Sequence, residues 1–140
     1  MIWTHGVFVL DDDRNRLDMG QISNWIRNAY WAIGRSHERV LESWSASAVV
    51  FGLYCNGTPV GCARVLTDFV TTAYLADVFI DSEYRGQGAG SWMMECIVSH
   101  PALENVRWLL HTRDAHQLYR KVGFEHAGER VMERPKRKES

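Results

Sequence analysis

The order of apolar and polar positions predicts a chain in which strands and helices are mixed. Short runs rich in β-branched and aromatic residues predict strands, and apolar residues recurring every three or four positions predict helices. The expected strands cover residues 6–10, 48–55, 60–66, 73–80 and 106–111, with a last strand or hairpin over 124–132. The expected helices lie between residues 18 and 34, after residue 36, after residue 88, and from about residue 115 to 122.

Local signals indicate where these elements begin and end. Asp18, with Gln21 three residues later, resembles a capping box at the start of the first helix, and Gly34 is expected to end that helix. Ser36 is expected to cap the second helix. The pair Asn56–Gly57 between two strands is a strong signal for a two-residue hairpin turn.

The order of the elements predicts an α/β (α+β) fold. A strand and two helices precede three antiparallel strands, and helix crossovers follow. Such an order favours a mixed, mostly antiparallel twisted sheet of six to seven strands with helices on both faces. We expect residues 1–140 to form a single domain, with the basic residues 134–140 as a frayed tail.

The most informative chemistry lies at three alternate glycines: Gly86, Gly88 and Gly90. They join an apolar strand to a helix with one apolar stripe, formed by Ala89, Trp92, Met93, Cys96 and Ile97. Glycine lets the backbone approach a ligand, and the free N–H groups of a helix start attract anions. The segment therefore predicts a phosphate site. Its spacing matches neither a Walker loop nor a dinucleotide fingerprint.

Arg85, Gly88 and Gly90 form the spacing Arg-x-x-Gly-x-Gly, and residues 118–124 have the pattern Leu-Tyr-x-x-x-Gly-Phe. The first motif resembles the acetyl-CoA pyrophosphate loop of the GNAT superfamily of N-acetyltransferases, and the second resembles a signature near the C-terminus of the same superfamily. From the residues alone, Tyr119 would be a core tyrosine on an amphipathic helix that Asp114 can cap. The resemblance spans nearly the whole chain and implies the GNAT-like fold.

The resemblance also implies an activity and a cosubstrate. The protein would move an acetyl group from acetyl-CoA to a primary amine of a small molecule or peptide, by direct attack in a ternary complex. Tyr119 would hydrogen-bond the departing sulfur as general acid, and Thr112 would replace a frequent asparagine. The alternative is a non-catalytic acyl-CoA-binding sensor or subunit. The expected acetyl-CoA contacts are Val78, Phe79, Ile80, Arg85, Gly86, Gln87, Gly88, Ala89, Gly90, Ser91, Thr112, Ala115 and Tyr119.

The general base and the acceptor site are less defined. Asp77 is the first candidate for the base, although an ion pair with a neighbouring arginine such as Arg64 explains it equally well. His111 and Asp68 are weaker candidates. Trp31 and Arg35 fall off the helical stripe, so we expect them to line the acceptor pocket. Trp25, Tyr30 and Trp44 lie on helical stripes, and we expect them in the core.

Composition narrows the class of protein. Apolar residues make up 46% and charged residues 24% of the chain, as in ordinary globular proteins, and a net charge of −1 gives no reason to expect a nucleic acid partner. No secretory leader or membrane span is apparent, and three cysteines without C-x-x-C spacing favour reduced thiols in the cytoplasm. No metal ligand set is evident. A homodimer through strand edges is compatible with the residues, but none requires it.

Overall fold

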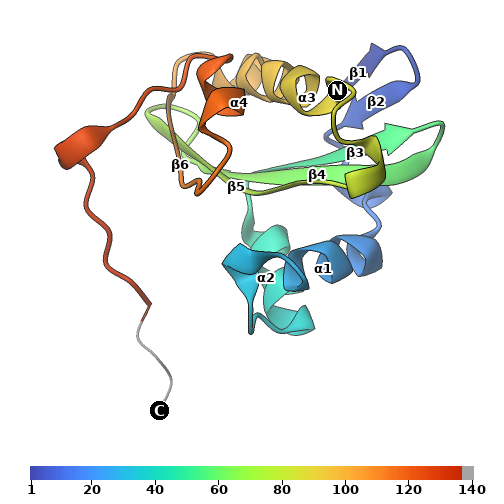
Figure 1. Ribbon diagram of the computed structural model, residues 1–140, viewed down its shortest axis with the longest axis horizontal. Coiled ribbons are helices and arrows are strands. Elements are labelled where there is room, and N and C mark those ends of the chain that lie inside the picture. The colour runs from blue at the N-terminus through green and yellow to red at the C-terminus, as the bar shows by residue number, and fades with distance from the viewer. Residues whose placement is uncertain (137–140) are drawn as a thin grey trace.

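A computed structural model describes residues 1–136 as one six-stranded sheet with two helices on each face (Figure 1). The strands lie side by side in chain order; all neighbours are antiparallel except β5 and β6, which are parallel. The mixed, mostly antiparallel sheet is therefore confirmed. The strands are β1 (Ile2–His5), β2 (Phe8–Asp11), β3 (Val49–Cys55), β4 (Thr58–Thr67), β5 (Thr72–Ile80) and β6 (Arg107–Leu110). The helices are α1 (Met19–Arg27), α2 (His37–Ala46), α3 (Ala89–Val98) and α4 (His116–Arg120).

Three of the predicted element ends are confirmed. The Asp18 carboxylate accepts a hydrogen bond from the Gln21 backbone N–H at 3.1 Å, and Ser36 Oγ accepts one from the Arg39 N–H at 3.2 Å. Each therefore satisfies a free donor at a helix start. Asn56 and Gly57 form the two-residue turn between β3 and β4, with φ angles of +50° and +82°.

The first helix is shorter than predicted. It ends at Arg27, with Asn28 as its C-cap, and the Asn28 side-chain amide donates to the Asn24 carbonyl at 2.7 Å. Asparagine favours helix ends because its side chain competes for backbone hydrogen bonds. The chain then continues through a 3-10 turn at Tyr30–Ala32. Tyr30 is consequently 41% exposed, so its predicted place in the core is wrong.

One strand was not predicted, and one strand prediction and one cap prediction are wrong. The sequence pattern missed β1, which pairs with β2 across a turn that contains Gly6 at φ +59°. Residues 124–132 contain only a 3-10 turn, at Gly128–Arg130, where Ala127 is in the helical region and Gly128 has a φ of +63°. Asp114 does not cap α4; the Thr112 hydroxyl accepts from the Ala115 N–H instead. The expected frayed tail includes residues 137–140, which lie outside the described residues.

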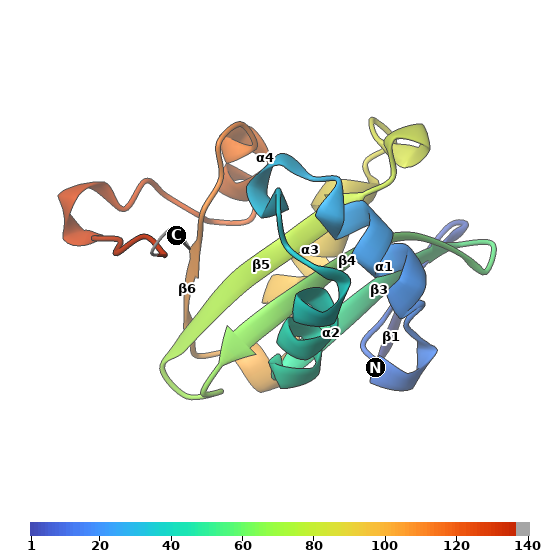
Figure 2. The same ribbon diagram turned by 90° about the horizontal axis from the view of Figure 1, so that it is seen from below.

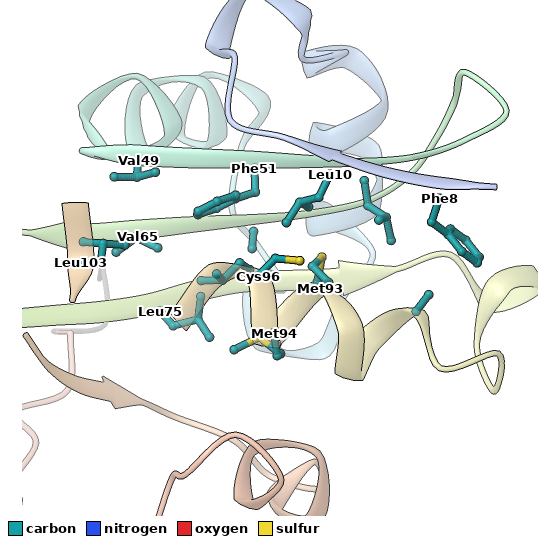
Figure 3. Packing of buried hydrophobic residues seen from close by; sticks show 14 of the residues in the cluster. Phe8, Leu10, Val49, Phe51, Val65, Leu75, Met93, Met94, Cys96 and Leu103 are labelled. Atoms are coloured by element: carbon teal, nitrogen blue, oxygen red, sulfur yellow. The ribbon is translucent and has the colours of Figure 1, made fainter. Parts of the chain in front are cut away.

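Two apolar cores hold the helices against the sheet. Figure 3 shows the larger core, in which strand residues such as Phe51 and Leu75 meet Met93 and Met94 of α3. The predicted stripe of α3 is confirmed, since Ala89, Met93, Cys96 and Ile97 are buried and Trp92 packs against them. The second core lies on the opposite face of the sheet, under α1 and α2. It contains Trp25 and Trp44, which were predicted to be in the core. Within residues 1–136, no helix has the length and apolar character needed to cross a membrane.

A bulge in β5 determines which side chains reach each face near the functional site. Cys62 pairs with Phe79 and Arg64 pairs with Ala76, so β5 carries one more residue than β4 between these pairs. The extra residue is associated with Asp77, whose φ is +51°. A bulge shifts the alternation of side chains between faces. Leu75 therefore packs with the α3 core, whereas Phe79 packs with the core under α1 and α2.

The fit of β4 against this bulge gives a stability prediction. A Cβ at Gly61 would lie 2.7 Å from the Phe79 carbonyl oxygen and 3.3 Å from the Leu53 side chain. We expect Gly61→Ala to lower the free energy of unfolding by about 1–3 kcal/mol in urea denaturation. The control is Gly20→Ala on α1, where a Cβ would make an ordinary 3.6 Å contact and helix propensity favours alanine. Equal stability of the two variants would contradict this register.

Candidate active site

A cavity of about 880 Å³ opens where β5 and β6 separate. Their parallel pairing covers Thr72–Leu75 of β5 and ends at Leu110 of β6. Beyond that point the two strands diverge, as Figure 2 shows, and residues 76–80 of β5 form one wall of the cavity. The other walls come from α4, from the segment that precedes α4, and from the segment between α1 and α2. The fold thus brings together sequence segments from four parts of the chain.

The glycine loop lies at one end of this cavity. Gly86 and Gly88 both have φ near +79°, a conformation that residues with a Cβ rarely adopt. Gly88 is the N-cap of α3, and no side chain caps the helix there. Its first-turn N–H groups are therefore available to a ligand, and the helix dipole favours an anion. Gly90 packs closely on β5, since a Cβ there would lie 3.2 Å from Ile80 Cδ1.

Arg85 is held against the strand that leads into the loop. Its Nε donates to the Ile80 carbonyl oxygen at 2.8 Å, and its guanidinium lies 5.5 Å from the centre of the Phe79 ring. Arg85 forms no ion pair with any carboxylate of residues 1–136. Its positive charge is thus placed beside the glycine loop, where it adds to the attraction of the helix start for an anion.

Tyr119 on α4 presents a neutral phenol to the cavity. The residue is 9% exposed, and its ring packs edge-on against Phe124 at a centroid distance of 5.7 Å. Burial raises the pKa of the phenol to about 12, with smaller contributions from Tyr30 and Asp114. Its hydroxyl makes no hydrogen bond with any group of residues 1–136. Tyr119 can therefore donate a hydrogen bond to a ligand atom.

Asp77 is the centre of a hydrogen-bonded network at the other end of the cavity. Its side chain is 2% exposed, and its oxygens accept from Arg64 Nε at 2.7 Å and Arg35 Nη1 at 2.9 Å. Trp31 Nε1 also donates to Asp77, at 3.1 Å. The sequence analysis gave an ion pair with Arg64 as the alternative to a role of Asp77 as general base, and this ion pair is present. With three donors on its oxygens, the carboxylate acts as a structural anchor for this end of the cavity.

The two weaker candidates for the base lie in different environments. The Asp68 carboxylate accepts from the N–H groups of Val70, Thr71 and Thr72 and from the Thr71 hydroxyl, and these donors hold its pKa far below the usual range. Asp68 therefore stabilises the turn between β4 and β5. His111, by contrast, lines the cavity, and its Nδ1 is hydrogen-bonded to the Tyr74 hydroxyl.

Several residues of the cavity wall were not predicted as site residues, among them Tyr30, Tyr74 and Arg113. The Arg113 guanidinium stacks over the Tyr30 ring at 3.6 Å, which joins the segment after α1 to the segment before α4. Strand alternation could have placed Tyr74 on the same face as Arg64. No pattern in the sequence pairs Arg113 with Tyr30, because the two segments meet only in the folded chain.

Most predicted site residues line the one cavity, and four do not. The residues on its wall are Trp31, Arg35, Asp77, Val78, Phe79, Ile80, Arg85, Gly86, Gly90, Thr112, Ala115 and Tyr119. The side chain of Gln87 turns back to donate to the Glu83 carbonyl, and Ala89 is buried in the first turn of α3. Gly88 and Ser91, at the start of α3, likewise lie outside the wall. Residues 1–136 contain no group of three or more His, Cys, Asp and Glu side chains that could hold a metal ion.

Comparison with known proteins places this architecture in a family. Residues 46–126 match the Acetyltransferase (GNAT) domain family. The Gibberella zeae protein named "Putative acetyltransferase FG08082" is 31% identical over 145 residues, which cover 87% of this chain and 81% of that protein. The chain belongs to the GNAT family and is an acetyltransferase.

Solved structures agree with this assignment. A GNAT-family protein from Xanthomonas campestris pv. campestris is 34% identical, with a TM-score of 0.86 and 94% of each chain covered. A protein from Clostridium acetobutylicum, described as a predicted acetyltransferase with acetyl-CoA, has the same fold at 15% identity, with a TM-score of 0.67 and 96% of each chain covered.

The Asp77 network gives a second stability prediction. In Asp77→Asn, the guanidinium groups of Arg35 and Arg64 would lose their shared negative partner in a largely buried site. We expect the free energy of unfolding to fall by about 3 kcal/mol in chemical denaturation. The control is Asp114→Asn, whose exposed pair with Arg113 spans 3.5 Å and should contribute less than about 1 kcal/mol. An Asp77→Asn protein as stable as the control would contradict the anchoring role.

Proposed function

We propose that this protein transfers the acetyl group of acetyl-CoA to a primary amine of a small molecule or peptide, by direct attack within a ternary complex. The observation that supports it is one cavity that joins a helix start with free N–H groups, the edge of β5 beyond β6, and the Tyr119 phenol. Membership of the GNAT family supports the same reaction, and a structural neighbour was solved with acetyl-CoA.

The residues of this cavity fit the parts of acetyl-CoA. The N–H groups between Gly86 and Ser91 would hold the diphosphate, assisted by the charge of Arg85. The edge of β5 would pair with the pantetheine amides. Because the Ile80 carbonyl already accepts from Arg85, Val78 and Phe79 would make most of these contacts. Acetyl-CoA supplies an activated thioester: the amine forms the new C–N bond, the C–S bond breaks, and the sulfur leaves with the electron pair.

Each catalytic group would act on a defined charge. A backbone N–H near Phe79 would stabilise the negative charge on the thioester oxygen. Tyr119 would donate a hydrogen bond to the departing sulfur. Full proton transfer from a phenol of pKa about 12 to a thiolate of ordinary pKa would be uphill by about 5 kcal/mol. In this proposal Tyr119 therefore stabilises the thiolate and keeps its own proton.

The proton of the attacking ammonium needs a base on the cavity wall. The Asp77 oxygens already accept from Trp31, Arg35 and Arg64, so we assign Asp77 to holding these residues in place. Of the other two bases on the wall within residues 1–136, Asp114 is paired with Arg113, so we assign the role to His111. In the tautomer in which its Nδ1–H donates to the Tyr74 oxygen, Nε2, which lies 3.6 Å from the Glu133 carboxylate, can accept a proton, directly or through water.

The decisive test of this function measures CoA thiol release from acetyl-CoA over a panel of primary amines. The proposal predicts release that depends on the amine, together with the acetylated amine in mass spectrometry. Tight binding of acetyl-CoA with no release from a broad panel would point to an acyl-CoA-binding protein without catalysis.

Acetyl-CoA binding itself gives a matched pair of variants. Gly88→Ala adds a methyl group at φ +79° where the diphosphate would bind, and we expect about tenfold weaker acetyl-CoA binding in calorimetry. Gly128→Ala is the control, because Gly128 also has positive φ and open space around its Cβ position but lies far from the loop in the sequence and outside the cavity wall. Equal acetyl-CoA affinities of the two variants would show that the glycine loop is not part of the acetyl-CoA site.

Tyr119→Phe separates chemistry from binding. We expect kcat to fall about 100-fold because the sulfur loses its hydrogen-bond donor, with the acetyl-CoA affinity within twofold of the wild type. Because its pKa is about 12, Tyr119 stays protonated at lower pH, and its ionisation should cause no loss of kcat below about pH 11. A wild-type kcat in the variant, with the chemical step shown to limit turnover, would exclude this role.

A further inference from the structure

The acceptor end of the cavity carries an excess of positive charge. Arg35 and Arg64 contribute two guanidinium groups, and Asp77 is the one carboxylate within residues 1–136 that is bonded to them. The other two arginines on the cavity wall make contacts away from this end. Arg113 lies 3.5 Å from Asp114, and Arg85 sits beside the glycine loop on the Ile80 carbonyl. One positive charge at this end is therefore not balanced by any carboxylate of residues 1–136 that contacts it.

Arg35 keeps one edge of its guanidinium for a ligand. Only its Nη1 contacts Asp77, at 2.9 and 3.2 Å. Its Nε and Nη2 form no hydrogen bond with any group of residues 1–136, and the side chain lines the cavity and is 23% exposed. These two nitrogens form a planar fork whose parallel N–H bonds match the two oxygens of a carboxylate.

The surrounding contacts hold this fork in place before any ligand binds. Asp77 is buried, and the bulge of β5 at φ +51° directs it to the face that carries Arg64. Arg64 in turn donates to Ser47 Oγ at 3.3 Å, and Trp31 donates to Asp77. Little side-chain entropy remains to be lost when an anion binds, and preorganisation of this kind favours affinity.

The excess charge also constrains the amine. A plain alkylammonium ion would enter a site where Arg35 and Arg64 repel it. Positive charge nearby disfavours the protonated amine and lowers its pKa, which favours the neutral, nucleophilic form. A negative group on the same molecule would offset the repulsion and allow binding. The aromatic rings of Trp31 and Tyr30, which meet edge-to-face at 5.2 Å, offer an apolar surface to the rest of the molecule.

We infer that the acceptor is an amino carboxylic acid, whose carboxylate binds the free edge of Arg35 while its amine faces the acetyl group. This inference rests on the proposed acetyl transfer and adds the chemical class of the acceptor. Arg35 would act as a substrate-binding residue, and the Trp31 and Tyr30 rings would receive an apolar side chain.

The experiment compares acceptors that differ only in charge. The α-amino acids with apolar or aromatic side chains are each paired with their own carboxamides, and CoA release from acetyl-CoA is measured for every pair. We expect kcat/KM for the best acid to exceed that of its amide by roughly tenfold to a hundredfold, the usual effect of a charge-assisted hydrogen bond. The amide has the less basic amine, so amine ionisation alone would favour the amide. Equal or better use of the amides would overturn the inference while leaving acetyl transfer intact.

Variants test whether Arg35 carries this preference. Arg35→Gln should raise KM for the acid roughly tenfold or more and leave KM for its amide nearly unchanged. Arg39→Gln, on the exposed face of α2 and outside the cavity wall, is the control and should behave as the wild type. Arg35→Lys keeps the charge but not the fork, and should restore only part of the affinity. A KM that rises equally for acid and amide would reduce Arg35 to a structural role and contradict the inference.

A binding measurement keeps the two proposals distinguishable. The acid and its amide are titrated into the CoA-loaded protein, and their binding is measured by calorimetry. The fluorescence of Trp31 gives a second measure of binding, with the Trp31→Phe variant as the reference. Arg35-dependent binding of the acid without any acetyl transfer would support the carboxylate site and contradict the proposed reaction. Absence of acid binding in the wild type, under conditions where CoA binds, would overturn the inference.

Discussion

The carboxylate of Asp77 is the contact on which the arrangement of the cavity depends. It lies on β5, yet its hydrogen-bond partners come from the segment between α1 and α2 and from β4. Burying a carboxylate is costly unless donors surround it, and the two arginines and one indole supply those donors. The segment after α1 has little regular structure of its own. It is therefore this charge, more than local propensity, that fixes the segment between α1 and α2 relative to the sheet.

The separation of β5 from β6 is the second constraint, and it follows from the length of the strands. β6 ends at Leu110, whereas β5 continues to Ile80 and into the glycine loop. A strand edge without a neighbour exposes main-chain donors and acceptors. In this family fold, that edge lies between a helix start suited to a phosphate and a buried phenol. The geometry thus gives an elongated ligand three different kinds of contact along one path.

Much of the fold was predictable because its signals are local. The Asn56–Gly57 turn, the Asp18 and Ser36 caps and the stripe of α3 depend on neighbours in the sequence, and the structure agrees with all of them. Predictions failed where a longer-range contact or a competing local bond decided the outcome. The last strand expected over 124–132 is absent, and the first helix stops at Asn28, which moves Tyr30 from the expected core to the cavity wall.

The sequence by itself determined the chemistry that resides in a contiguous segment. The glycines from 86 to 90 are recognisable without coordinates, because their spacing before a helix predicts an anion site, whereas Tyr119 is singled out by its resemblance to a family motif. Only the tertiary structure decided which partners Asp77 has and which edge of Arg35 stays free. Those properties depend on a bulge in β5 and on segments 42 and 46 residues apart that meet across the sheet. Such contacts produce no periodic pattern in the sequence, because they depend on the register of the strands and not on their composition.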